Sequence, residues 1–167
     1  MKYNFLTYLL SFGRIKGKHN KLTVIIKGIK LPLIVNFAKI KVKGDNNTIT
    51  ITYDKFKLKY LFFPRGLDTL INGKNCSLKL DSPPRIINSE IHLFSEDSEI
   101  YIKATRQKIE GAKFWITTGS KLYVGENSQM GNGGLKIVAV NNYERKSKVI
   151  IGDNFMAAQN CLMRTSD

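Results

Sequence analysis

A ten-residue pattern recurs along this chain, and its recurrence limits the fold more than any other feature of the sequence. The clearest copies cover residues 15–24, 42–51 and 71–80, and each reads apolar, any residue, Gly, a polar corner, then apolar-any-apolar. Three weaker copies follow. The apolar residues that close the six copies are spaced 27, 29, 22, 22 and 27 positions apart: Val24, Ile51, Leu80, Ile102, Val124 and Ile151. A repeat of this length, with alternating ends and polar turns, predicts a solenoid.

A six-residue rhythm in residues 149–167 makes this prediction more specific. Ile151, Ala157 and Met163 are six positions apart. Phe155 lies four positions after Ile151, and Cys161 lies four positions after Ala157. Such a rhythm suits a parallel β-helix in which each side of a coil is a short strand followed by a corner. We therefore predict an all-β chain in which residues 14–167 form one parallel β-helix domain. An alternative is a β-sandwich, whose hairpin strands alternate in the same way.

The closing pairs of the repeat predict which side chains face the core. The two residues of a pair are two positions apart, so both face the same side of their strand. We expect at least the second member of each pair inside: Leu22/Val24, Ile49/Ile51, Leu78/Leu80, Ile100/Ile102, Leu122/Val124 and Val149/Ile151. Residues 1–13, which include the apolar run FLTYLLSF, are predicted to cap the first coil, because its strand edges would otherwise be exposed.

Three segments interrupt the rhythm. Residues 31–35 bridge the first two coils, and Pro32 suits a strand start or an edge strand. Bulky side chains crowd residues 53–65, which we predict to be a strand whose aromatic residues pack outside the coil, or an interface. Residues 141–147 (NNYERKS) form a polar insertion, and an insertion at a solenoid edge is where a binding surface usually lies.

The net charge is +14, and lysines along the chain supply most of it. Many of them alternate with apolar residues, as outward strand positions would, and such lysines discourage edge-to-edge aggregation. The other interpretation is an anionic partner: an acidic polysaccharide, a membrane surface, a phosphorylated cofactor or nucleic acid. Nucleic acid is the least favoured, because no nucleic-acid motif is present and the aromatic residues form no stacking platform. No apolar run is long enough to cross a bilayer.

The cysteines and histidines give only weak indications of compartment, metal binding or catalysis. Cys76 and Cys161 fall at equivalent inward places of their copies, which predicts small core residues in a reducing compartment and hence a cytoplasmic location. Neither cysteine belongs to a metal-binding spacing. His19 lies in a polar corner and His92, between Ile91 and Leu93, is predicted to point outward. Neither histidine has a carboxylate or nucleophile pattern nearby that would favour catalysis.

From about Asn72 to Asp167 the chain resembles bacterial hexapeptide-repeat O-acyltransferases that modify capsular or cell-surface polysaccharides, including sialic-acid capsules. Residues 130–134 (MGNGG), 149–156 (VIIGDNFM) and 164–167 (RTSD) carry the resemblance, by their order and spacing. It implies a left-handed helix, acetyl-CoA as co-substrate, no metal, and a sugar or polysaccharide acceptor. It also implies a homotrimer for a complete enzyme. Separately from the resemblance, the positive charge is compatible with peripheral association with a membrane surface.

The resemblance also implies where catalysis would take place. A sugar hydroxyl becomes a good nucleophile only when a base removes its proton in the transition state. In the family a segment like RTSD leads directly to the catalytic histidine, which is therefore expected just after Asp167 rather than within this sequence. The resemblance thus implies an amino-terminal portion that is inactive alone. Asp167 is the expected orienting residue, and Arg164 and Asp167 the expected contacts to an anionic sugar. For both, an exposed coil end is the alternative.

Two other functions compete with acetyl transfer. One is a non-catalytic β-solenoid that binds anionic glycan through its lysine-rich surface. The other is a polysaccharide lyase or hydrolase, which would require a cluster of carboxylates on one face. The 13 acidic residues are instead scattered, mostly in predicted corners.

Overall fold

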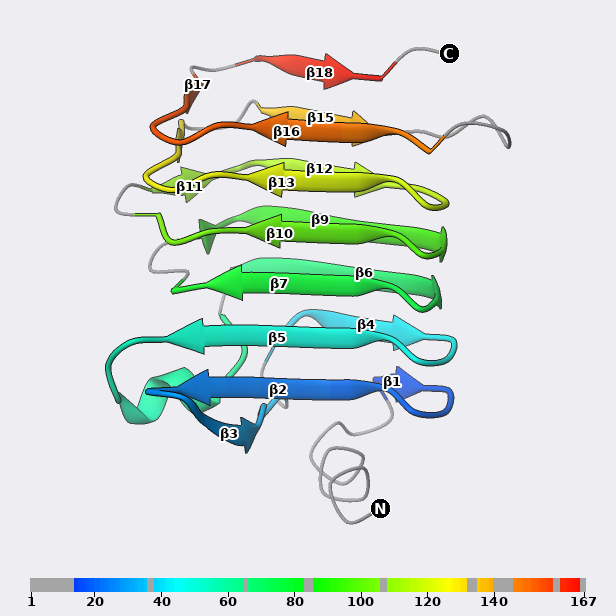
Figure 1. Ribbon diagram of the computed structural model, residues 1–167, viewed down its shortest axis with the longest axis vertical. Coiled ribbons are helices and arrows are strands. Elements are labelled where there is room, and N and C mark those ends of the chain that lie inside the picture. The colour runs from blue at the N-terminus through cyan, green and yellow to red at the C-terminus, as the bar shows by residue number, and fades with distance from the viewer. Residues whose placement is uncertain are drawn as a thin grey trace.

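The computed structural model describes residues 14–35, 38–64, 66–82, 86–105, 108–131, 135–139, 146–157 and 160–165. In these residues the chain forms a parallel β-solenoid whose coils stack along one axis (Figure 1). The predicted all-β solenoid is confirmed, and the copies of the repeat are not joined by antiparallel hairpins. The predicted cap at residues 1–13 lies outside the described residues.

Three sheets make up the sides of the described coils, and we name them faces A, B and C. Face A contains β1 (Ile15–Lys16), β4 (Ile40–Lys43), β6 (Leu67–Lys74), β9 (Ser89–Glu96), β12 (Lys113–Ile116), β15 (Lys136–Ala139) and β18 (Leu162–Arg164). Face B contains β3 (Ile29–Pro32), β2 (Lys21–Ile26), β5 (Thr48–Tyr53), β7 (Ser77–Asp81), β10 (Glu99–Ile102), β13 (Lys121–Val124) and β16 (Lys148–Ile151). The shorter face C contains β8 (Ile86–Ile87), β11 (Ile109–Glu110), β14 (Gln129–Met130) and β17 (Met156–Ala157).

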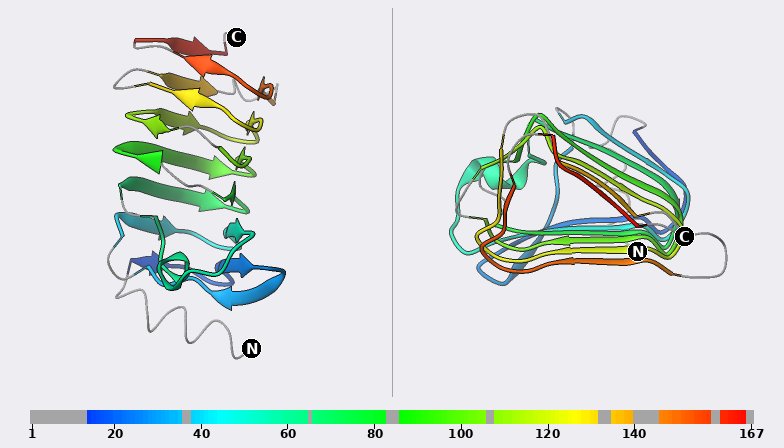
Figure 2. Two further views of the ribbon diagram at one scale, coloured as in Figure 1. Left: turned by 90° about the vertical axis from the view of Figure 1, so that its left-hand side faces the viewer. Right: turned by 90° about the horizontal axis from the view of Figure 1, so that it is seen from above.

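The solenoid winds in a left-handed sense. In Figure 1 the strands of face B, except the antiparallel β3, run to the left in front, those of face A run to the right behind them, and the chain climbs from blue to red. Viewed from above, the coils superpose in a triangular outline (Figure 2). The six-residue rhythm corresponds to the sides of this triangle, because Ile151, Ala157 and Met163 lie on faces B, C and A in turn.

The core is a set of inward rows that run from coil to coil on face B. The first members of the closing pairs stand in register from Leu22 to Val149, and the second members from Val24 to Ile151. Every second member is buried. Each side chain therefore packs on its counterpart one coil away, which is why a local sequence pattern suffices to build the core.

The corner between faces A and B explains why Gly and Asn recur at the same positions in successive copies of the repeat. A Cβ added at Gly17 would lie 2.0 Å from the Gly44 carbonyl oxygen, and one at Gly44 would lie 2.1 Å from that of Gly73. Buried asparagines tie these corners together. The side-chain amide nitrogen of Asn47 donates a hydrogen bond to the Gly73 carbonyl oxygen at 2.9 Å. The side-chain amide nitrogen of Asn20 donates in the same way to the Gly44 carbonyl oxygen.

Additional chain in the first two coils accounts for their longer spacing. After β2 the chain turns back as β3, which pairs antiparallel with β2 and ends at Pro32, so the predicted edge position of this proline is confirmed. β3 is the outer strand of face B in the described residues. It therefore covers an edge of the first coil that would otherwise be unpaired.

In the segment 53–65, the described residues that follow β5 do not form the predicted strand. Their centre is a 3-10 helix, η1 (Leu58–Leu61), and the Tyr60 ring stacks on Tyr53 with centroids 3.9 Å apart. Phe63 is buried, whereas Phe56 and Leu58 are exposed. Residues 55 to 61 have no strand partner, and only Phe62 makes a bridge, to Ile34. The bulky side chains thus fold as a loop against the coil rather than as a strand.

The two cysteines do not occupy equivalent places, which corrects the sequence-based prediction. Cys76 lies in the corner between faces A and B, where its backbone N–H donates to the Asn47 side-chain oxygen. Cys161 precedes β18, in the corner between faces C and A. Cys76 is buried, and this burial raises the pKa of its thiol, whereas Cys161 is half-buried. The error arose because a six-residue phase recurs on every face and does not identify which face a residue occupies.

Candidate functional site

Positive charge is concentrated in the first two coils. Residues 14–59 contain twelve Lys and Arg but only Asp45 and Asp54 as acids, a net charge of +10, whereas residues 66–126 contain eight of each sign. The five ion pairs of the described residues all use lysines from Lys79 to Lys121. The lysines of the first two coils therefore have no carboxylate partner among the described residues, and their charge faces solvent.

A groove on face A gathers several of these cations. It has a volume of about 620 Å³, and we call it the basal groove. Arg14, Lys16, Lys39 and Lys41 line it, together with Asp68, His92, Ala38, Ile40, Thr69 and Leu70. The lysines are exposed, and the Arg14 guanidinium donates to the Ala38 carbonyl, which fixes one wall of the groove. The groove thus combines four cations with one carboxylate.

Face A continues upward from the groove as one outward row. Lys41 stands opposite Leu70, Leu70 opposite His92, and then Trp115, Val138 and Arg164 follow in register. Neighbouring strands of a sheet are about 4.8 Å apart, so each step of the row rises by one coil. His92 is confirmed to point outward, because its neighbours Ile91 and Leu93 are buried.

Aromatic rings in this row are packed on one another. The His92 and Trp115 rings are parallel, with centroids 5.7 Å apart, and the Lys136 ammonium lies 4.1 Å from the Trp115 ring centroid. Trp115 consequently has a neighbour over each ring face. Because both faces of its ring are covered, Trp115 does not provide a platform on which a planar base could stack.

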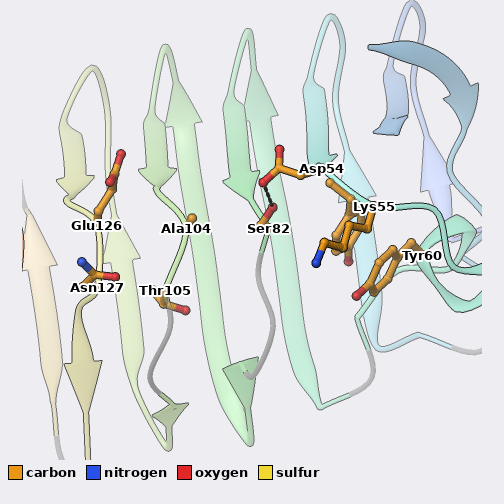
Figure 3. Close-up of a pocket in the computed structure, with 9 residues that line it drawn as sticks. Asp54, Lys55, Tyr60, Ser82, Ala104, Thr105, Glu126 and Asn127 are labelled. Carbon is orange, nitrogen blue, oxygen red and sulfur yellow. Dashed lines mark hydrogen bonds between the residues drawn. The ribbon is translucent and has the colours of Figure 1, made fainter. Parts of the chain in front are cut away.

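A second cavity lies at the corner between faces B and C, and we call it the corner pocket (Figure 3). Its volume is about 530 Å³, and it spans successive coils from Asp54 through Ser82 and Thr105 to Glu126. Figure 3 shows Lys55 and Tyr60 at one end and Glu126 and Asn127 at the other. Two carboxylates and one lysine line it, so this pocket lacks the excess of positive charge that the basal groove has.

Burial at the corner pocket raises the pKa of one tyrosine side chain. Desolvation, with a smaller contribution from the neighbouring Tyr60, raises the pKa of Tyr53 to about 12. Thr105 is also buried there, and its hydroxyl has no hydrogen-bond partner in the described part of the chain. These features give the pocket polar walls, in which the Ser82 hydroxyl donates to the Asp54 carboxylate at 3.5 Å (Figure 3).

The residues expected from the sequence are not assembled into one site. Arg164 lies in β18, is exposed, and stands opposite Val138. Asp167 lies outside the described residues. His92 is three strands away from Arg164 on face A, a separation of about 14 Å. His19 lies in the first corner, next to β2, at the other end of the solenoid. The polar insertion at 141–147 is described only for its last two residues.

Sequence reasoning missed the basal groove. The signal was present in the alternation of Lys39, Lys41 and Lys43 with apolar residues, combined with the lack of acids before Asp45. In the residues that the structure describes, no group of three or more His, Cys, Asp or Glu could hold a metal ion. None of the described helices has the length and apolar character needed to span a membrane. Comparison of the chain with family models, curated proteins and solved structures gives no match.

Proposed function

We propose that this solenoid is part of an acetyl-CoA-dependent O-acetyltransferase that acts on a sugar hydroxyl of an acidic cell-surface polysaccharide. The observation that carries the proposal is the last coil, where Ile151, Ala157 and Met163 occupy successive faces at intervals of six residues. This left-handed, hexapeptide-length coil supports the resemblance drawn from residues 130–134 and 164–167. The second support of the proposal is the resemblance itself.

In this proposal the described coils hold the acceptor. The transfer needs a base beside the acceptor hydroxyl and a donor for the developing charge on the thioester oxygen. His92 is about 14 Å from Arg164 along face A, too far to act as base at the end of β18. We therefore assign proton removal to a histidine outside the described coils, and the positioning of the anionic sugar to these coils.

The test joins residues 1–167 to the coils that follow the RTSD-like segment in a capsule O-acetyltransferase. The proposal predicts acetyl transfer from acetyl-CoA to an acidic oligosaccharide by this chimera, and none by the 167-residue chain. Changing the histidine of the appended coils to alanine is the matched control, and it should reduce the rate by about 10²–10⁴. A well-folded chimera that transfers no acetyl group, or turnover by the 167-residue chain, would contradict the proposal.

A second candidate is a non-catalytic solenoid that binds anionic glycan. The observation in its favour is the set of lysines in the first two coils that have no ion pair among the described residues. This candidate needs no cofactor and no base. It is preferred if the 167-residue chain binds acidic oligosaccharide while the chimera binds it equally well but transfers no acetyl group.

A further inference from the structure

We propose that the basal groove binds an acidic polysaccharide and holds the carboxylates of neighbouring sugar units against Arg14, Lys16, Lys39 and Lys41. This inference deepens the proposed function by naming the surface and the ligand class, and it rests on that function only for the role of the ligand as acceptor. The groove lies at the opposite end of the solenoid from Arg164, so it is a separate binding surface from the expected reaction site.

The first argument is charge complementarity. Four cations line the groove, Asp68 is the acid among its described lining residues, and none of the four makes an ion pair with a described carboxylate. Farther along the same face, Lys113 is neutralised by Glu90 at 3.0 Å. Like charges crowded in a concave surface raise the local potential and attract an anion. The groove is therefore where an anionic polymer gains most from binding.

The second argument is the spacing of the cations. Ile15 of β1 stands opposite Val42 of β4, so the residues before them, Arg14 and Lys41, lie side by side on neighbouring coils. Adjacent coils are about 4.8 Å apart. This distance is comparable with the length of one pyranose unit in an extended polysaccharide. A chain that runs along the solenoid axis can thus present one acidic sugar to each coil.

The third argument concerns the groups that accompany the cations. Asp68 and Leu70 alternate with the buried Thr69, so the Asp68 carboxylate lies on the outward side with Lys39 and Lys41. A carboxylate accepts hydrogen bonds from the free hydroxyls of a polysaccharide, which the backbone of a DNA strand does not offer. Trp115 has neighbours over both ring faces, so it offers no free face on which a base of a single-stranded nucleic acid could stack. These features favour a carboxylated polysaccharide over nucleic acid.

The experiment measures binding of the 167-residue chain to fluorescently labelled oligogalacturonate and oligosialic acid by anisotropy. Lys39→Glu/Lys41→Glu reverses two charges in the groove. Lys21→Glu/Lys30→Glu is the matched control, because it reverses two exposed lysines of the neighbouring first coil on face B. Methyl-esterified oligogalacturonate is the uncharged ligand control. Thermal melts of both variants establish that each is folded.

We expect at least one acidic oligosaccharide to bind, with an affinity that falls as salt rises, and the methyl ester to bind far more weakly. The groove variant should lose about tenfold or more in affinity and the face B variant less than about threefold. Equal losses in the two variants, or no binding of either acidic oligosaccharide, would overturn the proposal. Tighter binding of single-stranded DNA or of vesicles containing anionic phospholipid, with the same dependence on Lys39 and Lys41, would also overturn the polysaccharide assignment. Because the readout is binding, its outcome is independent of acetyl transfer by the chimera.

Discussion

The backbone N–H of Asn47 donates a hydrogen bond of 2.9 Å to the side-chain oxygen of Asn20, its counterpart one coil earlier. Asn47 then accepts a bond of the same length from the Cys76 backbone N–H in the next coil. The two asparagines thereby connect three consecutive corners through buried polar groups. Because unpaired buried polar groups are costly, this ladder fixes the register of the coils at the corner between faces A and B.

Replacing Asn47 should therefore destabilise the solenoid. Asn47→Ala leaves the Cys76 N–H and the Gly73 carbonyl without their partners, and each loss costs about 1–3 kcal/mol. The control is Asn72→Ala, since Asn72 is exposed on β6. Chemical denaturation of both variants gives the two free energies of unfolding. Equal values would show that the ladder contributes no stability.

Substitution of Gly44 tests how closely neighbouring coils approach each other at the corner between faces A and B. Gly44→Ala places a Cβ 2.1 Å from the Gly73 carbonyl oxygen, at a φ of +100°. Gly28→Ala has a comparable φ of +80° but meets no atom within 4 Å, so it carries only the conformational cost of about 1–3 kcal/mol. We expect Gly44→Ala to destabilise by several kcal/mol more than Gly28→Ala. The melting temperatures of the two variants should differ accordingly, and similar melting temperatures would mean that the corner relaxes without cost.

The facing of the last coil can be tested on β16. Ile151 is buried above Val124, and Lys148 on the same strand is exposed. Ile151→Asp should cost several kcal/mol, because it buries an unpaired carboxylate, whereas Lys148→Asp should change the free energy of unfolding by less than about 0.5 kcal/mol. Thermal unfolding that shows the same loss for both would reject the assigned facing.

The raised pKa of Tyr53 predicts that the protein loses stability at alkaline pH. Burial raises its pKa to about 12 in the folded protein, while the unfolded value is near 10. Above pH 10 the unfolded chain releases this proton and the folded protein retains it, so the contribution is present below pH 10 and is lost as pH rises toward 12. The loss is on the order of 2–3 kcal/mol. Tyr53→Phe should remove it, which denaturation at pH 9 and pH 11.5 measures. An unchanged pH dependence in Tyr53→Phe would contradict this assignment.

Much of the fold was predictable because a solenoid is built from contacts between neighbouring coils. The registers of Val24 with Ile51 and of Ile100 with Leu122 follow from a pattern that is visible in the sequence. The loop around Tyr60 was not predictable, because its stacking on Tyr53 depends on tertiary packing rather than on any period.

The candidate site was harder to predict than the fold. The basal groove unites Arg14, Lys41 and His92, which are brought together by the stacking of four coils. Its location depends on how many residues each corner contains, and the sequence pattern leaves those numbers free. The resemblance directed attention to Arg164, which the structure places at the other end of face A.

The most direct test of the central claim, that the basal groove is a binding site for acidic polysaccharide, is an amide NMR titration of the 167-residue chain with oligogalacturonate. The account predicts saturable shifts for Lys16, Lys39, Lys41 and His92, with Lys21 and Lys30 of face B left unchanged. Raising the salt concentration should reverse the shifts, because the attraction is between exposed charges. Shifts distributed equally over the lysines of both faces, or confined to the corner pocket, would contradict it.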